Sequence, residues 1–357
     1  MNPICGVKKM IKKDAGLLKN LVEQILMKVG SNFDHAHRVA EALVSSNLAG
    51  VDGHGIWHMR MYVEEIKKGE IIPNAKPDIL LDTPTSALIT GNWGFGFVSA
   101  KLAMDLAIRK ARDQNIAVTA IVQTGHIGRL GEYVEMAAME GMISFVFAGG
   151  YSEKQQSTVP YGGAEKILHT NPLAIGIPVG DNTPIVVDFA TTTLSGSKVK
   201  LAALQGKKVT SGAIVDANGN PTIDPNDFIN GGAHLPFGLH KGFGIMLAIE
   251  YLGRIFAGSD SYAEGNKGGL YSGHQGISFV VMKADCFSNM SDFLERGEEM
   301  QNRVNKVKPA KGFDQVNTPG DIERKIRLDR EKNGIPLSSA EWEDLKSLAV
   351  EVGVRVN

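Results

Sequence analysis

Apolar residues recur at helical spacing through the first seventy positions of the chain. Residues 14–29 and 34–49 each place leucine, isoleucine, valine and alanine on one face, and each run ends at a glycine. Asp34 stands where an N-cap is expected for the second run. A third apolar run starts beside His54 and reaches Gly69. The pattern predicts three amphipathic helices, with His54 at the start of the third.

Beyond residue 86, short β-branched runs alternate with helical ones. Strands are predicted at 87–90, 116–122, 143–147, 173–179, 184–189 and 277–282. Helices are predicted at 97–113, 129–140, 242–257, 291–306 and 320–333, with a last helix after a capping box, Ser338 and Glu341. This alternation is typical of an α/β protein with some parallel pairing. We expect an N-terminal helical segment (1–75), an α/β core (76–315) and a C-terminal helical segment (316–357).

Composition narrows the class of protein. The chain has 357 residues and a formal net charge of −1, without basic blocks, which argues against nucleic acid or an anionic membrane surface as the main partner. Cys5 and Cys286 are the only cysteines, so no disulfide framework is expected. No run reaches the roughly 18 apolar residues of a membrane helix. The N-terminus has no apolar leader, and the protein is expected in the cytoplasm.

The usual nucleotide motifs are missing from the sequence. No G-x-G-x-x-G occurs, and the nearest glycine runs, Gly91 to Gly96 and Gly125 to Gly131, have the wrong spacing. A pyrophosphate on the first helix of a Rossmann sheet therefore has no support. There is also no P-loop, H-E-x-x-H or G-x-S-x-G. If a nucleotide binds, it binds by other means.

His54 is the first candidate for chemistry, because it stands between Gly53 and Gly55. Flanking glycines remove side-chain bulk and let a small molecule approach. Imidazole changes charge near neutral pH, so it can pass a proton to or from a substrate. The alternative is a surface or cap histidine that follows a turn. We expect few packing partners for its ring.

Other clusters carry similar alternatives. His126 lies among glycines after a predicted strand, where α/β ligands usually bind, or it belongs to a helix-capping turn. Asp188 ends a strand and suits a hydrogen bond to a ribose or an amide, or it is a turn former. Lys241 lies among glycines at a predicted helix start, which suits a phosphate, or it is an exposed loop lysine. Gly320 and its neighbours alone indicate only a turn.

Together these stretches resemble the malate/L-lactate dehydrogenase family of the second type, which includes ureidoglycolate, diketogulonate and sulfolactate oxidoreductases. The resemblance spans roughly residues 12–350, and its motifs occur in the family's order. They are His54-Gly55, the His126 turn, Pro160 to Gly163, Thr170 to Pro172, Val187 to Thr191, Asn220 to Pro225, His240 to Gly242, and Pro319-Gly320. Each motif is weak alone, but the ordered set is specific.

The resemblance implies a function and a set of site residues. The expected protein is an NAD- or NADP-dependent oxidoreductase that transfers a hydride between nicotinamide and C2 of a small 2-hydroxy or 2-keto acid. Its fold would be the family's own α/β arrangement, non-Rossmann, with a mixed sheet and helical N- and C-terminal segments, assembled as a homodimer with the active site near the interface. His54 would be the acid/base group and His126 would line the pocket and share the proton work. The implied cofactor residues are Pro184, Ile185, Val186, Val187, Asp188, Phe189, Ala190, His240, Lys241, Thr318, Pro319 and Gly320.

Two departures from the family pattern concern the substrate. Gly53 replaces a serine found in many members, and His58 replaces an arginine four residues after the histidine. A substrate carboxylate is usually held by an arginine fork, so Arg60 or Arg129 is expected to take that role. The alternatives are a ureidoglycolate or sugar-acid dehydrogenase of the same family, a metal-dependent hydrolase using the histidines and Asp188, and a ligand-binding protein on a former enzyme scaffold. No close-spaced metal-ligand pair supports the hydrolase.

Overall fold

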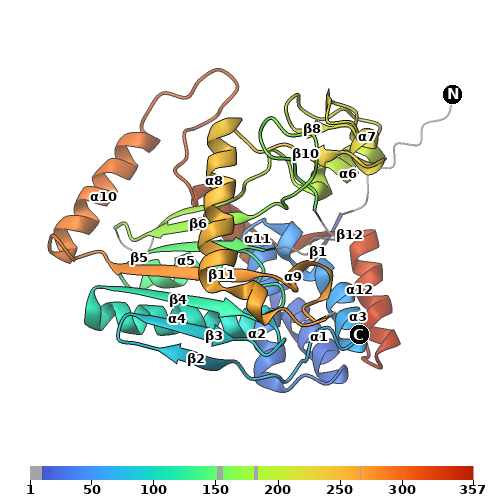
Figure 1. Cartoon of the computed structure of the whole chain (residues 1–357), viewed down its shortest axis with the longest axis horizontal. Coiled ribbons are helices and arrows are strands. Elements are labelled where there is room, and N and C mark those ends of the chain that lie inside the picture. Colours follow the sequence, from blue (N-terminus) through green and yellow to red (C-terminus); the bar gives the residue numbers. More distant parts are fainter. Residues whose placement is uncertain (1–9, 151–155, 181–183, 266, 357) are drawn as a thin grey trace.

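A mixed sheet of seven strands forms the centre of the structure (Figure 1). The computed structural model describes residues 10–150, 156–180, 184–265 and 267–356, so Cys5 lies outside it. Within these residues the strand order is β2-β3-β4-β11-β5-β6-β7. The strands are β2 (Asp78–Asp82), β3 (Ser86–Thr90), β4 (Ile116–Val122), β5 (Met142–Gly149), β6 (Pro172–Ile177), β7 (Ile185–Ala190) and β11 (Gly276–Lys283).

The pairing of these strands is mostly antiparallel. In the described part of the sheet, only β3 and β4 are parallel neighbours. Strand β11 enters between β4 and β5, so that Ile277 pairs with Ile121 on one side and with Ala148 on the other. This arrangement is not a doubly wound Rossmann sheet, as the missing glycine motif predicted.

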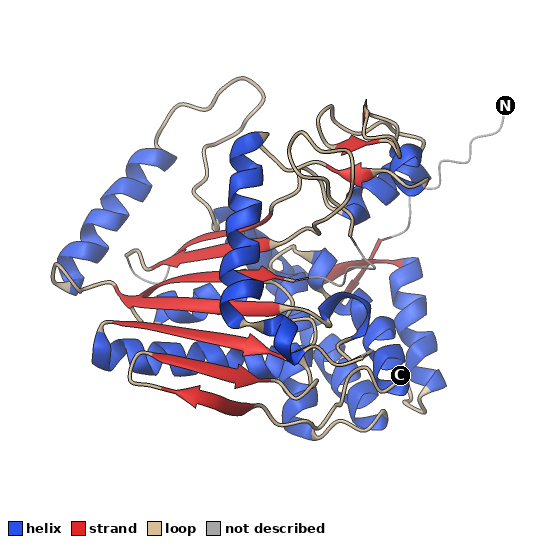
Figure 2. Cartoon of the chain, in the orientation of Figure 1, coloured by secondary structure: helices blue, strands red, loops and turns tan. Residues whose placement is uncertain are grey.

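Helices cover both faces of the sheet, as Figure 2 shows. Helices α4 (Gly96–Gln114) and α5 (Gly131–Met139) pack behind it in the view of Figure 1. Helix α8 (His240–Glu250) and the π-helical turn η4 (Tyr251–Ile255) cross its front. Small residues on α4, such as Ala100, Ala103 and Ala107, are fully buried and let the helix lie close to the strands.

The two ends of the chain share one core. Their elements are β1 (Met10–Lys13), α1 (Ala15–Lys28), α2 (Phe33–Leu48), α3 (Met59–Lys67), α11 (Asp321–Asn333), β12 (Ile335–Ser338) and α12 (Ser339–Glu351). Strands β1 and β12 pair antiparallel, and Leu18, Tyr62 and Leu345 lie in the same buried cluster. The expected N- and C-terminal helical segments therefore pack as one layer beside the sheet.

The helix ends test the capping predictions. Ser338 and Glu341 form the predicted capping box at the start of α12. Asp34 is not the cap of α2: Asn32 is, and its Oδ1 accepts a hydrogen bond from the His35 backbone N–H at 2.9 Å. Asp34 lies inside the first turn, where its charge still favours the positive end of the helix dipole.

Several short elements were not predicted from the sequence. They are the edge strand β2, the small sheet of β8 (Ile214–Val215), β9 (Pro221–Thr222) and β10 (Ala233–His234), and the helices α6 (Gly196–Leu204), α7 (Pro225–Ile229), η5 (Ser259–Tyr262) and α9 (Gly269–Ser272). Helix α10 (Met290–Asn305) was predicted, and it is set apart from the sheet in Figure 1. Among the described residues, no helix is both long and apolar enough to cross a membrane.

Candidate active site

His54 lies in a short turn rather than at the first residue of a helix. Two 3-10 turns, η1 (Asp52–His54) and η2 (Ile56–His58), precede α3, so the predicted position of His54 at a helix start is only approximate. Gly55 separates the two turns. A Cβ atom there would overlap the amide of Asn47, whose Oδ1 accepts the Ile56 backbone N–H at 3.0 Å. Only glycine fits this close approach.

Three aromatic side chains gather around His54, and we call His54, His58, Tyr62 and His126 the histidine cluster. The rings of His54 and His126 are stacked, with centroids 5.4 Å apart. His58 lies 5.3 Å from His126, ring centre to ring centre. Tyr62 Oη is hydrogen-bonded to His126 Nδ1 at 2.8 Å. The expectation that His54 has few packing partners is therefore wrong, while the structure does bring His54 and His126 together.

His126 reaches this cluster from a loop, not from the first turn of a helix. Strand β4 ends at Val122 and α5 begins at Gly131. The helix therefore starts two residues later than the predicted start at residue 129. The ring of Phe97, at the start of α4, meets His126 edge-on at 6.2 Å. These contacts hold the loop histidine over the turn that carries His54.

The histidines of the cluster are held in their neutral form. Burial, with smaller contributions from His58 and Arg129, lowers the pKa of His54 to about 4. Burial also lowers the pKa of His58, and that of His126 well below its ordinary value. Nδ1 of His54 and Nδ1 of His58 are buried without a hydrogen-bond partner in the described structure. Neutral imidazoles with free nitrogens can accept a proton from a bound ligand.

Arg129 brings a positive charge to this group. Its side chain is 2% exposed, Nη2 donates to Glu135 at 2.7 Å, and Nε has no partner in the described structure. Asp188 lies beside it and accepts the Gly131 backbone N–H at 2.7 Å. The residue keeps some solvent access, but its carboxyl is surrounded by protein, and this desolvation raises the pKa of Asp188 to about 6. Arg129 is near enough to His54 to influence its charge.

Arg60, the other arginine expected to hold a carboxylate, is engaged elsewhere. Its Nε donates to Asp344 at 2.7 Å, and its Nη1 donates to Glu351 at 3.1 Å. Both acceptors belong to α12, so Arg60 ties α3 to the C-terminal helix. The structure thus directs one of the two candidate arginines to the histidine cluster and the other away from it.

The expected cofactor segments lie along strand β7. The Val186 backbone N–H donates to Pro319 at 3.1 Å, which places residues 318–320 beside the start of the strand. Gly320 has φ of +97°, and a side chain there would press on Val186. At the other end of β7, Phe189 packs on Phe237 with ring centres 5.3 Å apart, just before α8.

The start of α8 is open to ligands. His240 and Lys241 are exposed there, with the ring of Tyr161 5.9 Å from that of His240. A helix N-terminus with a nearby lysine suits a phosphate. Of the segments that the resemblance implied as cofactor contacts, residues 318–320 thus lie beside the start of β7, and the loop that leads into His240 and Lys241 packs on its other end through Phe237.

Tyr62 is a site residue that was not predicted from the sequence. It follows His54 by eight residues, so a helical reading of the turn could have placed both on one face. His58 was read only as a departure from a family, although its spacing of four from His54 indicated the same face. Glu135, the partner of Arg129, has no comparable signal, because its role depends on the path of the loop before α5.

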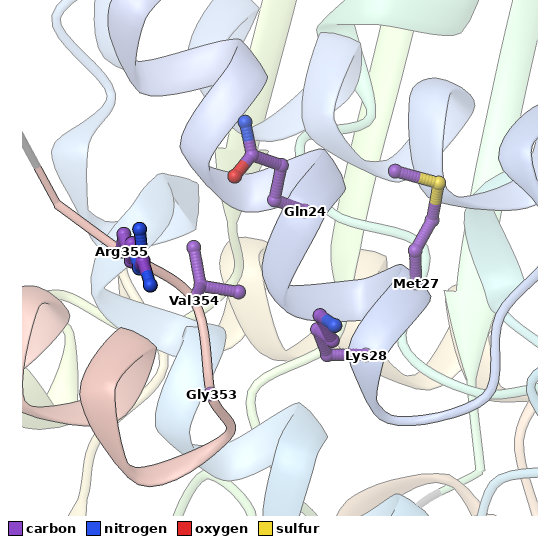
Figure 3. Close-up of a pocket in the computed structure, with 6 residues that line it drawn as sticks. All are labelled: Gln24, Met27, Lys28, Gly353, Val354 and Arg355. Atoms are coloured by element: carbon purple, nitrogen blue, oxygen red, sulfur yellow. The ribbon is translucent and has the colours of Figure 1, made fainter.

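In the described residues, no group of three or more histidine, cysteine, aspartate or glutamate side chains is arranged to hold a metal. A pocket of about 320 Å³ opens between α1 and the C-terminal tail (Figure 3). Its lining residues are Gln24, Met27, Lys28, Gly353, Val354 and Arg355, and none belongs to the histidine cluster.

Comparison with known proteins identifies the family. A family model described as malate/L-lactate dehydrogenase matches residues 14–346. The malate/(S)-sulfolactate dehydrogenase of Methanothermus fervidus is 34% identical over 340 residues, covering 95% of this chain and 97% of that protein. The L-sulfolactate dehydrogenase of Methanocaldococcus jannaschii is 32% identical over 342 residues, covering 95% of this chain and 96% of that protein.

A solved structure supports the same family assignment as the family model and the two relatives. The crystal structure of malate dehydrogenase from Entamoeba histolytica matches with a TM-score of 0.89 and 27% identity, covering 98% of this chain and 99% of that one. The family and the fold predicted from the ordered motifs are confirmed. The chain belongs to the malate/L-lactate dehydrogenase family of oxidoreductases.

Proposed function

We propose that the protein is an NAD- or NADP-dependent dehydrogenase of a small 2-hydroxy acid. The observation that carries the proposal is the neutral imidazole of His54, stacked on His126 and close to the buried Arg129. Proton transfer at a hydroxyl and binding of a neighbouring carboxylate need these two groups together. Relatives named as malate, sulfolactate and ureidoglycolate dehydrogenases support the same class of substrate.

The roles of the residues follow from their charge states. In the oxidative direction, His54 accepts the proton of the substrate hydroxyl, because its imidazole is neutral at pH 7. In the reductive direction, the protonated ring returns that proton to the carbonyl oxygen. Arg129 binds the substrate carboxylate, and His126 lines the pocket. The nicotinamide, when bound, supplies the acceptor or donor of the hydride at C2.

The residues along β7 fit a dinucleotide. Asp188 is an exposed acidic residue within β7, and the turn at Gly320 packs against Pro184 and Val186 at the start of the same strand. Lys241 offers a charge at the helix start for a phosphate. Pro184 to Ala190, His240, Lys241 and Thr318 to Gly320 are therefore retained as the proposed cofactor contacts.

The activity itself is tested by following reduced nicotinamide absorbance with a panel of 2-keto acids. The panel includes oxaloacetate, pyruvate, sulfopyruvate, a sugar-derived keto acid and oxalurate, each with NADH and with NADPH. We expect one substrate and one cofactor to dominate by kcat/KM. No oxidation of either cofactor with any keto acid, by a folded protein that binds the dinucleotide, would favour the ligand-binding alternative.

Lys241→Ala should weaken dinucleotide binding without disturbing the fold. The side chain is exposed, so solvent screens part of its attraction to a phosphate, and we expect a loss of about tenfold in cofactor affinity. Titration of intrinsic fluorescence with NADH and NADPH measures it. The matched control is Lys332→Ala, which removes an exposed lysine on a different helix, α11. Equal affinities in both variants would return Lys241 to the exposed-loop interpretation.

We also propose that the chain forms the homodimer expected from the resemblance. Large apolar side chains are exposed along α8 and η4: Leu247, Tyr251, Ile255 and Phe256 are 41%, 57%, 56% and 62% exposed. Their spacing places them on one stripe, as at many interfaces between copies.

Light scattering of the native protein should give twice the chain mass. The double variant Ile255→Asp with Phe256→Asp should give the mass of a monomer. A monomeric native protein at micromolar concentration would contradict the proposal.

A further inference from the structure

Arg330 on α11 holds the turn that carries His54. Its Nη1 donates to Asp52 Oδ1 at 2.6 Å and its Nη2 donates to Asp52 Oδ2 at 3.0 Å. Nη1 also donates to the backbone carbonyl of Asn47, at the end of α2. The arginine side chain is 13% exposed and that of Asp52 is 43% exposed, so the guanidinium is enclosed while water still reaches the carboxylate. The paired geometry of this fork constrains direction as well as distance.

The same network reaches both sides of His54. Asp52 Oδ1 also accepts the Asn47 side-chain N–H at 2.7 Å, and Asn47 Oδ1 accepts the Ile56 backbone N–H. Inside the turn, the His54 backbone N–H donates to Val51 at 2.9 Å. Asp52, before His54, is therefore bonded to the Asn47 side-chain amide and to the Arg330 guanidinium, and Ile56, after His54, is bonded to the same amide. Replacing Arg330 would remove the guanidinium from Asp52 and from the Asn47 carbonyl, and would leave the Asn47 side chain as the remaining anchor of the turn.

Helix α11 is itself anchored at its other end. Asp321 Oδ2 accepts the backbone N–H and the hydroxyl of Thr318, both at 2.9 Å, and Arg324 donates to Asp321 Oδ1 at 2.9 Å. Arg327 donates to Ser45 on α2 at 3.1 Å. The helix thus runs from the proposed cofactor segment at 318–320 to the turn at 52–55, and its bonds tie each end in place.

We propose that Arg330 is a positioning residue for His54. It holds Asp52 and the end of α2 so that the His54 imidazole stays stacked on His126 and aimed at the substrate oxygen, without contacting the reacting atoms itself. The inference rests on the proposed function of His54. A displacement of about 1 Å in a catalytic group can cost roughly a hundredfold in rate, so a loosened turn should reduce turnover.

The first test compares Arg330→Met and Arg330→Lys with a control, Lys110→Met. Lys110 is an equally enclosed cation, 11% exposed, that bonds Asp82 and Thr83 at the far edge of the sheet. We expect Arg330→Met to lower kcat about tenfold or more, with cofactor affinity within twofold of native. Arg330→Lys, which keeps the charge but not the fork, should recover part of kcat. Lys110→Met should lower the melting temperature and leave kcat unchanged.

A double variant separates positioning from stability. Once Arg330→Met has released Asp52, adding Asp52→Asn should lower kcat little further, because both changes remove the same bond. Normal kcat in Arg330→Met, with a melting temperature lowered as in Lys110→Met, would overturn the proposal. So would full additivity of the two substitutions, since independent effects on kcat imply that the pair does not act as one anchor.

A second readout does not depend on turnover. The Trp57 ring contacts that of His58 in a tilted arrangement with ring centres 4.2 Å apart, and its Nε1 donates to the Gly53 carbonyl at 3.0 Å. Fluorine NMR of protein labelled with 5-fluorotryptophan reports on this ring, with Trp57→Phe used for assignment. We expect the Trp57 resonance to shift or broaden in Arg330→Met and to stay unchanged in Lys110→Met. An unshifted resonance overturns the proposal, whereas absent turnover in native protein would refute only the proposed function.

Discussion

Substitution of His54 by alanine should abolish most turnover while the protein remains folded and binds its cofactor. A positioned acid/base group typically contributes about 10²–10⁴-fold to the rate, so kcat should fall by that amount. The cofactor segments along β7 contain no part of the 52–55 turn, and dinucleotide affinity should therefore stay within twofold. His37→Ala is the control, because His37 is a half-exposed histidine that bonds Glu23 and lies outside the histidine cluster.

The pH dependence of turnover should reflect the lowered pKa of His54. Burial lowers the pKa of His54 to about 4, so the imidazole is unprotonated from pH 5 upward and can act as a base. The kcat/KM for oxidation should be level from pH 5 to 8 and should fall as the pH drops through about 4. Reduction needs the protonated ring, so its rate should rise as the pH falls. Both limbs should vanish in His54→Ala.

His126 is the competing acid/base candidate. It stacks on His54 and is hydrogen-bonded to Tyr62, so the two rings share one environment. If His126 transfers the proton, His126→Ala will remove turnover and its pH dependence, and His54→Ala will chiefly raise the Michaelis constant. Measured pH–rate profiles of both variants decide between them. Near-normal kcat in His54→Ala would refute our assignment.

The elements that sequence predicted well are those whose signal is local. The apolar faces of α1 and α2, the β-branched run of β4 and the capping box of α12 depend on residues close to each other along the chain. The same is true of the motifs that led to His54 and His126. Their convergence across the structure followed from the family resemblance, not from the spacing of either residue.

What the sequence could not supply depends on distant partners. Strand β11 enters the sheet between β4 and β5, and nothing in Gly276 to Lys283 indicates that position. The strands of the small sheet have two residues each, too few for a periodic pattern. Arg60 was expected at the substrate because it is close to His54 along the chain. Helix α3 instead directs the Arg60 side chain toward acidic residues of α12, which lie almost three hundred residues further along the chain.

Arg129 should prove to be the group that selects a carboxylate. The arginine is almost fully buried, and its Nε is unpartnered in the described structure, so a substrate carboxylate could occupy the free donor. A hydrogen bond to a charged group contributes about 1.5–3 kcal/mol, and the enclosed site favours the upper end. For Arg129→Lys we therefore expect kcat/KM for the preferred keto acid to fall about a hundredfold, chiefly through the Michaelis constant.

Arg129→Lys is preferred to removal of the charge, because Glu135 and Asp188 would otherwise lose their nearest cation, with only Arg327 left at 4.0 Å from Glu135, and the fold would suffer. Cofactor affinity should be unchanged, and the amide of the same keto acid, which has no carboxylate, should lose far less than the acid. Arg60→Lys provides the comparison between the two arginines that the sequence offered. Its pairing with Asp344 and Glu351 is partly exposed, so a small loss of stability and a kcat/KM within twofold of native are expected. The reverse order, with Arg60→Lys losing the carboxylate preference and Arg129→Lys keeping it, would place the carboxylate site on α3 and require that arginine to leave α12 when substrate binds.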